Sequence, residues 1–151
     1  MKNFFDFTGK VVLVTGASSG IGRATAELFG QCGASVAVSY LKNRAGAEAA
    51  VASISSNGAA YAAGAAAAVG VAVPRAISVQ ADVTEKSEVE RLVREVEESL
   101  GPIDVLVNNA GSLVERLGTL DLTEDRWDEV MDLNVKSAFF AAQAAIPKML
   151  E

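Results

Sequence analysis

The apolar residues of this chain gather in four short runs, and longer segments of mixed polarity separate them. The runs are "KVVLVTG" at 10–16, "ASVAVSY" at 34–40, "RAISVQADV" at 75–83 and "IDVLVNNAG" at 103–111. A short, almost wholly apolar run that is rich in β-branched residues is typical of a strand buried on both faces of a parallel sheet. The pattern therefore predicts four strands.

The segments between these runs have helical periodicity. After the first run, one helical face carries Ile21, Ala24, Leu28 and Cys32, and Gly33 ends the helix. The single cysteine in this segment is expected to be a buried structural thiol. The segment "AGAEAAVASIS" at 45–55 predicts a second helix.

The third helix has the clearest pattern in the chain. We expect Thr84 to cap it and Gly101-Pro102 to end it. Its apolar stripe consists of Val89, Leu92, Val93, Val96 and Leu100.

Two helices are predicted after the fourth strand. Thr123 can cap a short acidic helix, "EDRWDEVMDL". The apolar segment "NVKSAFFAAQAAIPKML" predicts a final helix.

Strands and helices alternate along the chain, which predicts an α/β fold with a Rossmann-type, doubly wound parallel sheet. Residues 1–151 are expected to form one domain. Residues 58–73 break the alternation, because this stretch is rich in alanine and interrupted by three glycines. We interpret it as an inserted surface loop or frayed helix without function.

Composition narrows the possible partners. The net charge of −6 argues against nucleic acid, which requires clustered Lys and Arg. No apolar run reaches the ~20 residues that span a bilayer, and the N-terminus does not resemble a signal peptide. The chain has no histidine, and its one cysteine fits a reducing compartment. We expect a cytoplasmic protein with no membrane partner and no metal site.

The stretch "TGASSGIG" joins the first strand to the first helix and carries the main chemical signal. Its glycines, Gly16, Gly20 and Gly22, permit a sharp turn and a close approach of the backbone to a ligand. The helix N-terminus that follows offers unpaired N–H groups and the positive end of a dipole to a pyrophosphate. The alternative is a tight turn that binds nothing. A P-loop is excluded because no Lys-Ser or Lys-Thr follows the last glycine.

Four motifs in order resemble the short-chain dehydrogenase/reductase family. They are "TGASSGIG", Asp82-Val83, "NNAG" at 108–111 and Asn134 in "DLNVKSAFF". Within that family the sequence is most similar to the 3-oxoacyl-[acyl-carrier-protein] reductases. The resemblance covers nearly the whole chain outside the alanine-rich stretch, and implies a domain that binds NAD(P).

The resemblance also implies roles for individual residues. Asp82 would accept a hydrogen bond from the adenine amino group, with the Val83 backbone beside it. Asn134 resembles the catalytic-site asparagine that helps to hold a proton-relay water, and a role in starting a helix is also compatible with its position. Residues of the glycine turn would wrap the pyrophosphate and the adenosine ribose, and residues of "NNAG" would line the cofactor cleft: Gly16, Ser18, Gly20, Ile21, Gly22, Asn109, Ala110 and Gly111. Independently of the resemblance, the hydroxyls of Ser18 and Ser19 could contact phosphate or ribose.

The end of the second strand bears on the choice of cofactor. NAD-using relatives place an acid there, which holds both ribose hydroxyls and repels a 2′-phosphate. This chain has Tyr40 at that position, with Lys42 and Arg44 just beyond. Cations suit the additional phosphate of NADP. NADP(H) is therefore favoured over NAD(H), although Leu41 stands where many NADP-using relatives have arginine.

The family reaction transfers a hydride between nicotinamide and a carbonyl or alcohol carbon of a small-molecule substrate. The resemblance implies that it also requires a Ser, a Tyr and a Lys four residues after that Tyr. Neither Tyr40 nor Tyr61 has a lysine at that spacing. We therefore expect the cofactor-binding half of an oxidoreductase, truncated after the fourth strand and the helices that follow it, and inactive in hydride transfer by itself.

Two alternatives to an oxidoreductase half stay open. One is a non-catalytic nucleotide-binding or interaction module, and the other is a truncated product without function. A sheet that ends at its fourth strand leaves an open edge, and such edges are normally covered. We therefore expect a homo-oligomer or a partner that completes the sheet.

Overall fold

The computed structural model describes residues 5–64 and 73–151. Within these residues, strands and helices alternate as the sequence predicts, up to the fourth strand. The elements are β1 (Val11–Val14), α1 (Gly20–Gln31), β2 (Ser35–Tyr40), α2 (Arg44–Gly64), β3 (Ala76–Gln80), α3 (Lys86–Leu100), β4 (Val105–Val107), α4 (Glu124–Met131), the π-helical turn η2 (Asp132–Lys136) and α5 (Ser137–Met149).

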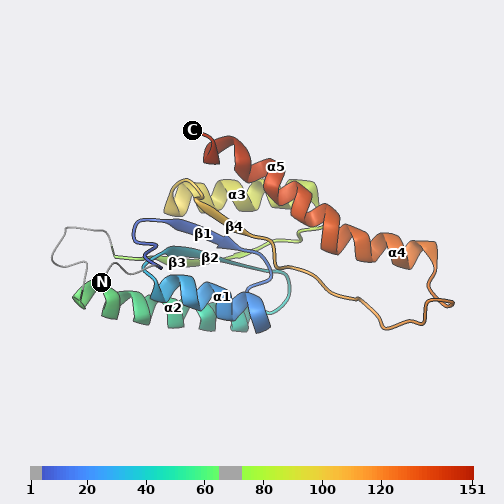
Figure 1. Ribbon diagram of the computed structural model, residues 1–151, viewed down its shortest axis with the longest axis horizontal. Coiled ribbons are helices and arrows are strands. Elements are labelled where there is room, and N and C mark those ends of the chain that lie inside the picture. The colour runs from blue at the N-terminus through green and yellow to red at the C-terminus, as the bar shows by residue number, and fades with distance from the viewer. Residues whose placement is uncertain (1–4, 65–72) are drawn as a thin grey trace.

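The four strands form one parallel sheet in the order β3-β2-β1-β4. Helices α1 and α2 cover one face of this sheet, and α3 and α5 cover the other (Figure 1). The doubly wound α/β architecture is thereby confirmed. The strand order reverses between β1 and β4, and in sheets of this kind ligands bind at the carboxyl ends of the strands beside such a reversal.

Alternation along the strands divides the core into two layers. Val12 and Val14 of β1 face α1 and α2, while Val11 and Leu13 face α3 and α5. All four are buried. This two-sided burial explains why β1 is apolar at every position rather than at alternate positions.

Helix α1 packs through its small residues. Its buried positions are Gly22, Ala26 and Gly30, and a Cβ on Gly30 would lie only 2.5 Å from Cγ2 of Ile54 in α2. The close approach of the two helices requires this glycine, since no larger side chain fits between them.

The apolar face predicted for α1 therefore does not belong to the core. Ile21 is 81% exposed and Leu28 is 60% exposed, and Ala24 is exposed beside them. The expectation that Cys32 is buried is wrong, because this residue is only partly buried. The apolar stripe predicted from helical periodicity does exist on α1, but it faces away from the core. The face that packs against α2 and the sheet is the one with small residues, because they allow close contact.

Helix α3 matches its prediction along most of its length. Val89, Leu92, Val93 and Val96 are buried, and Gly101 follows the last residue with φ 109°. The predicted cap at Thr84 is wrong, because Glu85 precedes the first helical residue. The Thr84 hydroxyl donates instead to Asp82 Oδ1 at 2.6 Å, so that it belongs to the turn after β3.

The alanine-rich stretch at 58–73 lies partly within helix. Helix α2 continues to Gly64, which takes in the first residues of the stretch. Residues 65–72 fall outside the described parts of the chain, so the prediction of an inserted loop or frayed helix stays a prediction there.

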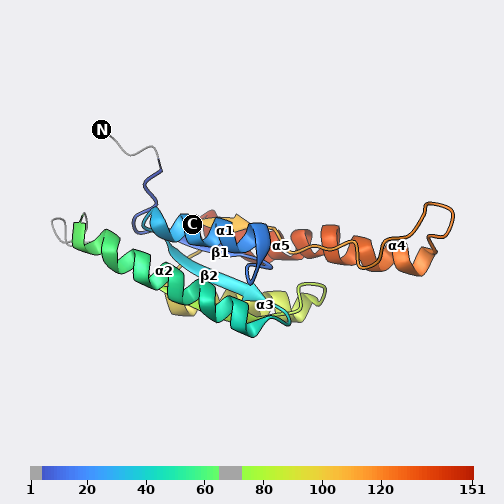
Figure 2. The ribbon, with the colours of Figure 1, turned by 90° about the horizontal axis from the view of Figure 1, so that it is seen from below.

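The last helices form one continuous rod. Thr123 caps α4 as predicted, and its Oγ1 accepts from the Arg126 N–H at 3.3 Å. The π-helical turn η2 then joins α4 to α5 without a break. The rod carries α4 beyond the end of the sheet, as Figure 2 shows. None of the described helices is long and apolar enough to cross a membrane.

A carboxylate anchors the start of the edge strand β4 to β1. Asp104 Oδ1 accepts from Lys10 Nζ at 2.7 Å, and its Oδ2 accepts from the Val11 N–H at 2.9 Å. Burial opposes ionisation of Asp104, but the two hydrogen bonds outweigh it and hold the pKa of this carboxyl below its ordinary value of 3.8. The stabilisation is present above that ordinary value and is lost as the pH falls through the lowered pKa.

Candidate functional site

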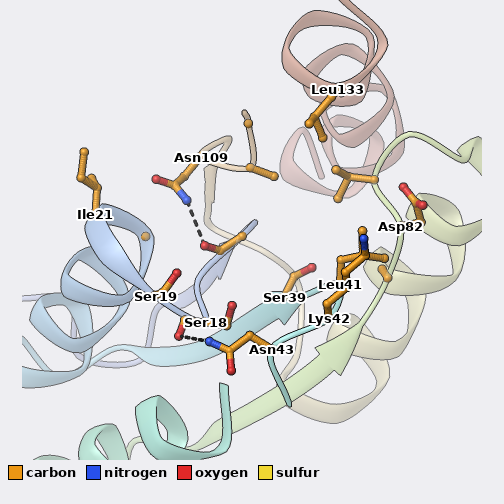
Figure 3. Close-up of a pocket in the computed structure, with 16 residues that line it drawn as sticks. Ser18, Ser19, Ile21, Ser39, Leu41, Lys42, Asn43, Asp82, Asn109 and Leu133 are labelled. Atoms are coloured by element: carbon orange, nitrogen blue, oxygen red, sulfur yellow. Dashed lines mark hydrogen bonds between the residues drawn. The ribbon is translucent and has the colours of Figure 1, made fainter. Parts of the chain in front are cut away.

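A cleft of about 560 Å³ opens at the carboxyl ends of the strands (Figure 3). Its volume lies in the range of small-molecule sites, roughly 300–1,000 Å³. Four loops at the strand ends, the first turn of α1, one residue of β2 and one residue of η2 form its walls. The lining residues are Gly16, Ser18, Ser19, Ile21, Gly22, Ser39, Leu41, Lys42, Asn43, Ala81, Asp82, Val83, Asn109, Ala110, Gly111 and Leu133. Of the residues singled out from the sequence, Gly20, Tyr40, Arg44 and Asn134 lie outside this lining.

The glycine turn is pressed against the segment that follows β4. Gly16 has φ 64°, and a Cβ there would lie 2.9 Å from the Ala110 Cα. A Cβ on Gly22 would overlap the Asn109 side-chain amide and the Gly16 carbonyl oxygen. Neither position has room for a side chain, because the backbone at each glycine is in direct contact with another backbone segment or with a side-chain amide.

The N-terminus of α1 opens into the cleft. Ser19 occupies the N-cap position, but its side chain makes no capping hydrogen bond, so the first N–H groups of α1 have no side-chain acceptor from the cap. Gly20 has φ 55°, and a Cβ there meets no described atom within 4 Å. The backbone at Gly20 is thus open to an approaching ligand, and a helix terminus of this kind favours an anion.

Thr15 ties the glycine turn to the loop after β4. Its Oγ1 accepts from the backbone N–H groups of Asn109 and Ala110, both at 3.0 Å. In the opposite direction, Asn109 Nδ2 donates to the carbonyl oxygens of Thr15 at 2.8 Å and Gly16 at 3.2 Å. The Thr15 N–H donates to Val107 O at 3.0 Å. This bond extends the backbone hydrogen bonding between β1 and β4 by one residue, up to the side-chain contacts of Thr15 and Asn109.

The loop after β2 supplies the cation of the cleft. Lys42 lines the cleft, and in the described residues it enters no salt bridge. Arg44 instead pairs with Glu48 at 2.7 Å, and this hydrogen bond raises the pKa of the guanidinium. The structure places Tyr40 in the core beside α2, where it is 7% exposed.

Ser39 places a hydroxyl at the base of the cleft. The residue is 1% exposed, and its Oγ has no hydrogen-bond partner among the described residues. A buried hydroxyl without a partner is costly. Because Ser39 lies among the lining residues, a ligand that enters the cleft comes close to this hydroxyl.

Asp82 and Val83 form the far wall, at the carboxyl end of β3. Asp82 Oδ1 accepts from the Thr84 N–H at 3.0 Å and from the Thr84 hydroxyl at 2.6 Å. Within the described part of the chain its Oδ2 makes no hydrogen bond, which leaves one carboxylate oxygen available to a donor.

Asn134 lies in η2, and its side-chain amide binds backbone groups. Its Nδ2 donates to the carbonyl oxygens of Ser112 and Val130, both at 2.8 Å, and its Oδ1 accepts from the Ser112 N–H at 3.2 Å. The side chain thereby ties the loop after β4 to the π-helical turn. Leu133, the preceding residue, reaches the cleft instead.

Thr15, Ser39 and Asn43 are site residues that the sequence patterns did not predict. A signal for each was present. Thr15 directly follows a buried strand, Ser39 is a polar residue in an otherwise apolar run, and Asn43 precedes a helical segment, where asparagine is a preferred cap.

The cleft has the chemistry of a site for a phosphate-bearing ligand with a flat organic group. One end offers a helix N-terminus to an anion. The other end combines the apolar side chains of Leu41, Ala81 and Val83 with one lysine and one carboxylate. Among the described residues, no group of three or more His, Cys, Asp or Glu side chains is placed to hold a metal ion.

Comparison with known proteins assigns this chain to one family. The family profile described as short chain dehydrogenase matches residues 10–151. The 3-oxoacyl-[acyl-carrier-protein] reductase FabG of Staphylococcus aureus is 38% identical over 141 residues, which are 93% of this chain and 51% of that protein. The chain thus spans about half the length of the curated relatives it matches.

Solved structures agree with this placement. A blue fluorescent protein from a metagenomic library, solved in complex with NADPH, is similar with a TM-score of 0.80 and 33% identity, over 95% of this chain and 53% of that one. An NADH-dependent reductase responsible for alginate metabolism has a TM-score of 0.80 and 31% identity, over 96% of this chain and 53% of that one.

Replacing the Thr15 hydroxyl should loosen the tie beneath the cleft. Thr15→Val keeps the shape of the side chain but leaves the N–H groups of Asn109 and Ala110 without their acceptor. We expect the free energy of unfolding to fall by about 1–3 kcal/mol in chemical denaturation. Thr119→Val, at an exposed turn, is the matched control and should stay within about 0.5 kcal/mol. A Thr15→Val variant as stable as this control would contradict the role given to the hydroxyl.

Proposed function

This chain belongs to the short-chain dehydrogenase family, and on that premise we propose that its residues hold an NAD(P) dinucleotide for an oxidoreductase. The reaction proposed for the whole protein is hydride transfer between the nicotinamide and a carbonyl or alcohol carbon of a small-molecule substrate. The observation that carries the proposal is the N-terminus of α1, which opens into the cleft without a side-chain cap.

The residues present fit such a cofactor. Its pyrophosphate needs N–H donors and a backbone that it can approach closely, and the turn at Gly20 offers both. Its adenine needs an apolar slot with a hydrogen-bond acceptor, which Leu41, Val83 and the second oxygen of Asp82 supply.

The proposal assigns the cleft in three parts. Asp82 and Val83 hold the adenine. Asn109, Ala110 and Gly111 form the wall beside β4. The pyrophosphate and the adenosine ribose contact the glycine turn: Gly16, Ser18, Ser19, Gly20, Ile21 and Gly22.

NADP(H) is the cofactor we favour, because the positively charged Lys42 can bind the additional 2′-phosphate. This ammonium group lies in the lining and is not engaged in a salt bridge with a described residue. Arg44 contributes less in this proposal than the sequence pattern suggests, because Glu48 already pairs with it. Tyr40 contributes by packing beneath the loop rather than by contact with the cofactor.

Binding of the dinucleotide, rather than the chemical step, is the part of the activity that we assign to these 151 residues. When bound, the nicotinamide supplies the hydride or accepts it. Asn134 is the one residue here that matches the family's catalytic set, and we propose that it organises the loop at Ser112 beside the reacting end. The 151 residues contain no tyrosine with a lysine four positions later.

We also propose that the chain acts in association with another polypeptide surface in a reducing, cytoplasmic compartment. Strand β4 is the edge of the described sheet, and its residues are only half-buried. Trp127, Val135 and Phe139 are each more than half exposed along the rod that begins at α4. A homo-oligomer or a partner that pairs with β4 would cover both surfaces.

A methyl group on Gly20 should block the approach of the pyrophosphate. We expect Gly20→Ala to weaken NADPH binding by about tenfold or more, since it both fills the approach and strains a positive φ. Gly9→Ala is the matched control, because Gly9 also has a positive φ, 77°, with no described atom within 4 Å of an added Cβ. Gly9 precedes β1, whereas Gly20 begins α1 between the cleft residues Ser19 and Ile21. Equal NADPH affinities in the two variants, measured by calorimetry, would refute the assignment of the cleft.

Removing the Lys42 ammonium should affect only the phosphorylated cofactor. We expect Lys42→Ala to weaken NADPH binding about five- to tenfold and to leave NADH binding within about twofold, because only NADPH carries the 2′-phosphate. Arg44→Ala is the control and should change the preference little. A larger loss of NADPH affinity in Arg44→Ala than in Lys42→Ala would contradict the assignment of Lys42 to the 2′-phosphate.

A further inference from the structure

The loop between β2 and α2 is joined to the glycine turn by one side chain. Asn43 Nδ2 donates to the Ser18 carbonyl oxygen at 3.4 Å, at the long end of the range for a hydrogen bond. In the other direction, Asn43 Oδ1 accepts from the Gly46 N–H at 3.0 Å, in the first turn of α2. Figure 3 shows the amide between Ser18 and the start of α2. Asn43 thus caps α2 and contacts the turn that we assign to the pyrophosphate.

Gly46 shows how closely these three groups approach one another. A Cβ on Gly46 would overlap both the Ser18 carbonyl oxygen and the Asn43 Nδ2. Gly46 does not have a positive φ, so the need for glycine here comes from space alone. The first turn of α2 is therefore packed against the glycine turn, with the Asn43 amide between them.

Lys42 directly precedes this amide along the chain. The position of its ammonium group relative to the glycine turn consequently depends on how the 42–43 loop is held against Ser18. A cation selects a 2′-phosphate best when it is held at a suitable distance from the pyrophosphate site, because the same ribose bears the 2′-phosphate and is linked to the pyrophosphate.

We propose that Asn43 is a positioning residue that fixes Lys42 relative to the glycine turn and so sets the preference for dinucleotides that carry a 2′-phosphate. This inference rests on the proposed function. It assigns a share of the selectivity to an uncharged side chain, in addition to the share that Lys42 supplies through its charge.

Asn43→Ser separates the two contacts of the amide. Serine is as good a helix cap as asparagine, so the bond to the Gly46 N–H and the melting temperature should be retained. Its shorter side chain does not reach the Ser18 carbonyl. We expect the Kd for NADPH to rise about fivefold and the Kd for NADH to change less than about twofold, as measured by calorimetry on the 151-residue chain.

Gly46→Ala provides a second, independent test. Alanine is the better helix former, so a loss of selectivity in this variant does not come from a weaker α2. The added methyl group should separate Asn43 from Ser18 and lower the NADPH preference as Asn43→Ser does. Ala49→Gly, at an exposed position of the same helix, is the control and should keep the preference of the unaltered chain although it weakens the helix.

A double-mutant cycle distinguishes positioning from a general structural role. In a Lys42→Ala background, Asn43→Ser should cause no further loss of NADPH affinity, because there is no ammonium group left to position. Additive losses, or equal losses for NADPH and NADH, would overturn the inference while the dinucleotide site stands. If the unaltered chain bound neither dinucleotide, both the proposed function and this inference would be overturned.

Discussion

The cleft depends on the hydrogen-bonded tie between Thr15 and Asn109. At the point where the strand order reverses, β1 leads into α1 on one face of the sheet and β4 leads toward α5 on the other face, and ligands bind beside such a reversal. Beyond the last backbone bond between the two segments, the Thr15 hydroxyl accepts from the loop after β4 and the Asn109 amide donates to the glycine turn. They hold the loop after β4 against the glycine turn, and the two segments together form one wall of the cleft.

The contacts between Thr15 and Asn109 also explain why Gly16 and Gly22 cannot carry side chains. Because the loop after β4 is held against the glycine turn, the space above Gly16 is filled by Ala110 and the space above Gly22 by the Asn109 amide. Of the three glycines in this motif, Gly20 alone has no described atom within 4 Å of an added Cβ. The three glycines of the motif therefore have different roles. Gly16 and Gly22 permit close packing against the loop after β4, and Gly20 permits the approach of a ligand. On the other side, Asn43 holds the β2–α2 loop against the same turn.

Patterns along the chain predicted the fold better than they predicted the site. Buried parallel strands are continuous apolar runs, and α3 has a wide stripe of large residues, so both are visible in the sequence. The core face of α1 was predicted wrongly, because it consists of Gly22, Ala26 and Gly30, small residues that contribute little to a hydrophobic pattern. The glycine turn and the carboxyl ends of the strands could be located in advance. The side chains of Tyr40 and Arg44 could not, because burial and the pairing with Glu48 depend on packing and rotamers.

The most direct test of the account is amide hydrogen exchange of the 151-residue chain with and without saturating NADPH. Ligand binding slows exchange where it contacts the backbone or restricts its opening. The account predicts slower exchange at residues 16–22, 42–43, 82–83 and 109–111, and no change in α4. Exchange that is unaffected by NADPH, or slowed only along α4 and α5, would contradict the claim that these residues form a dinucleotide site.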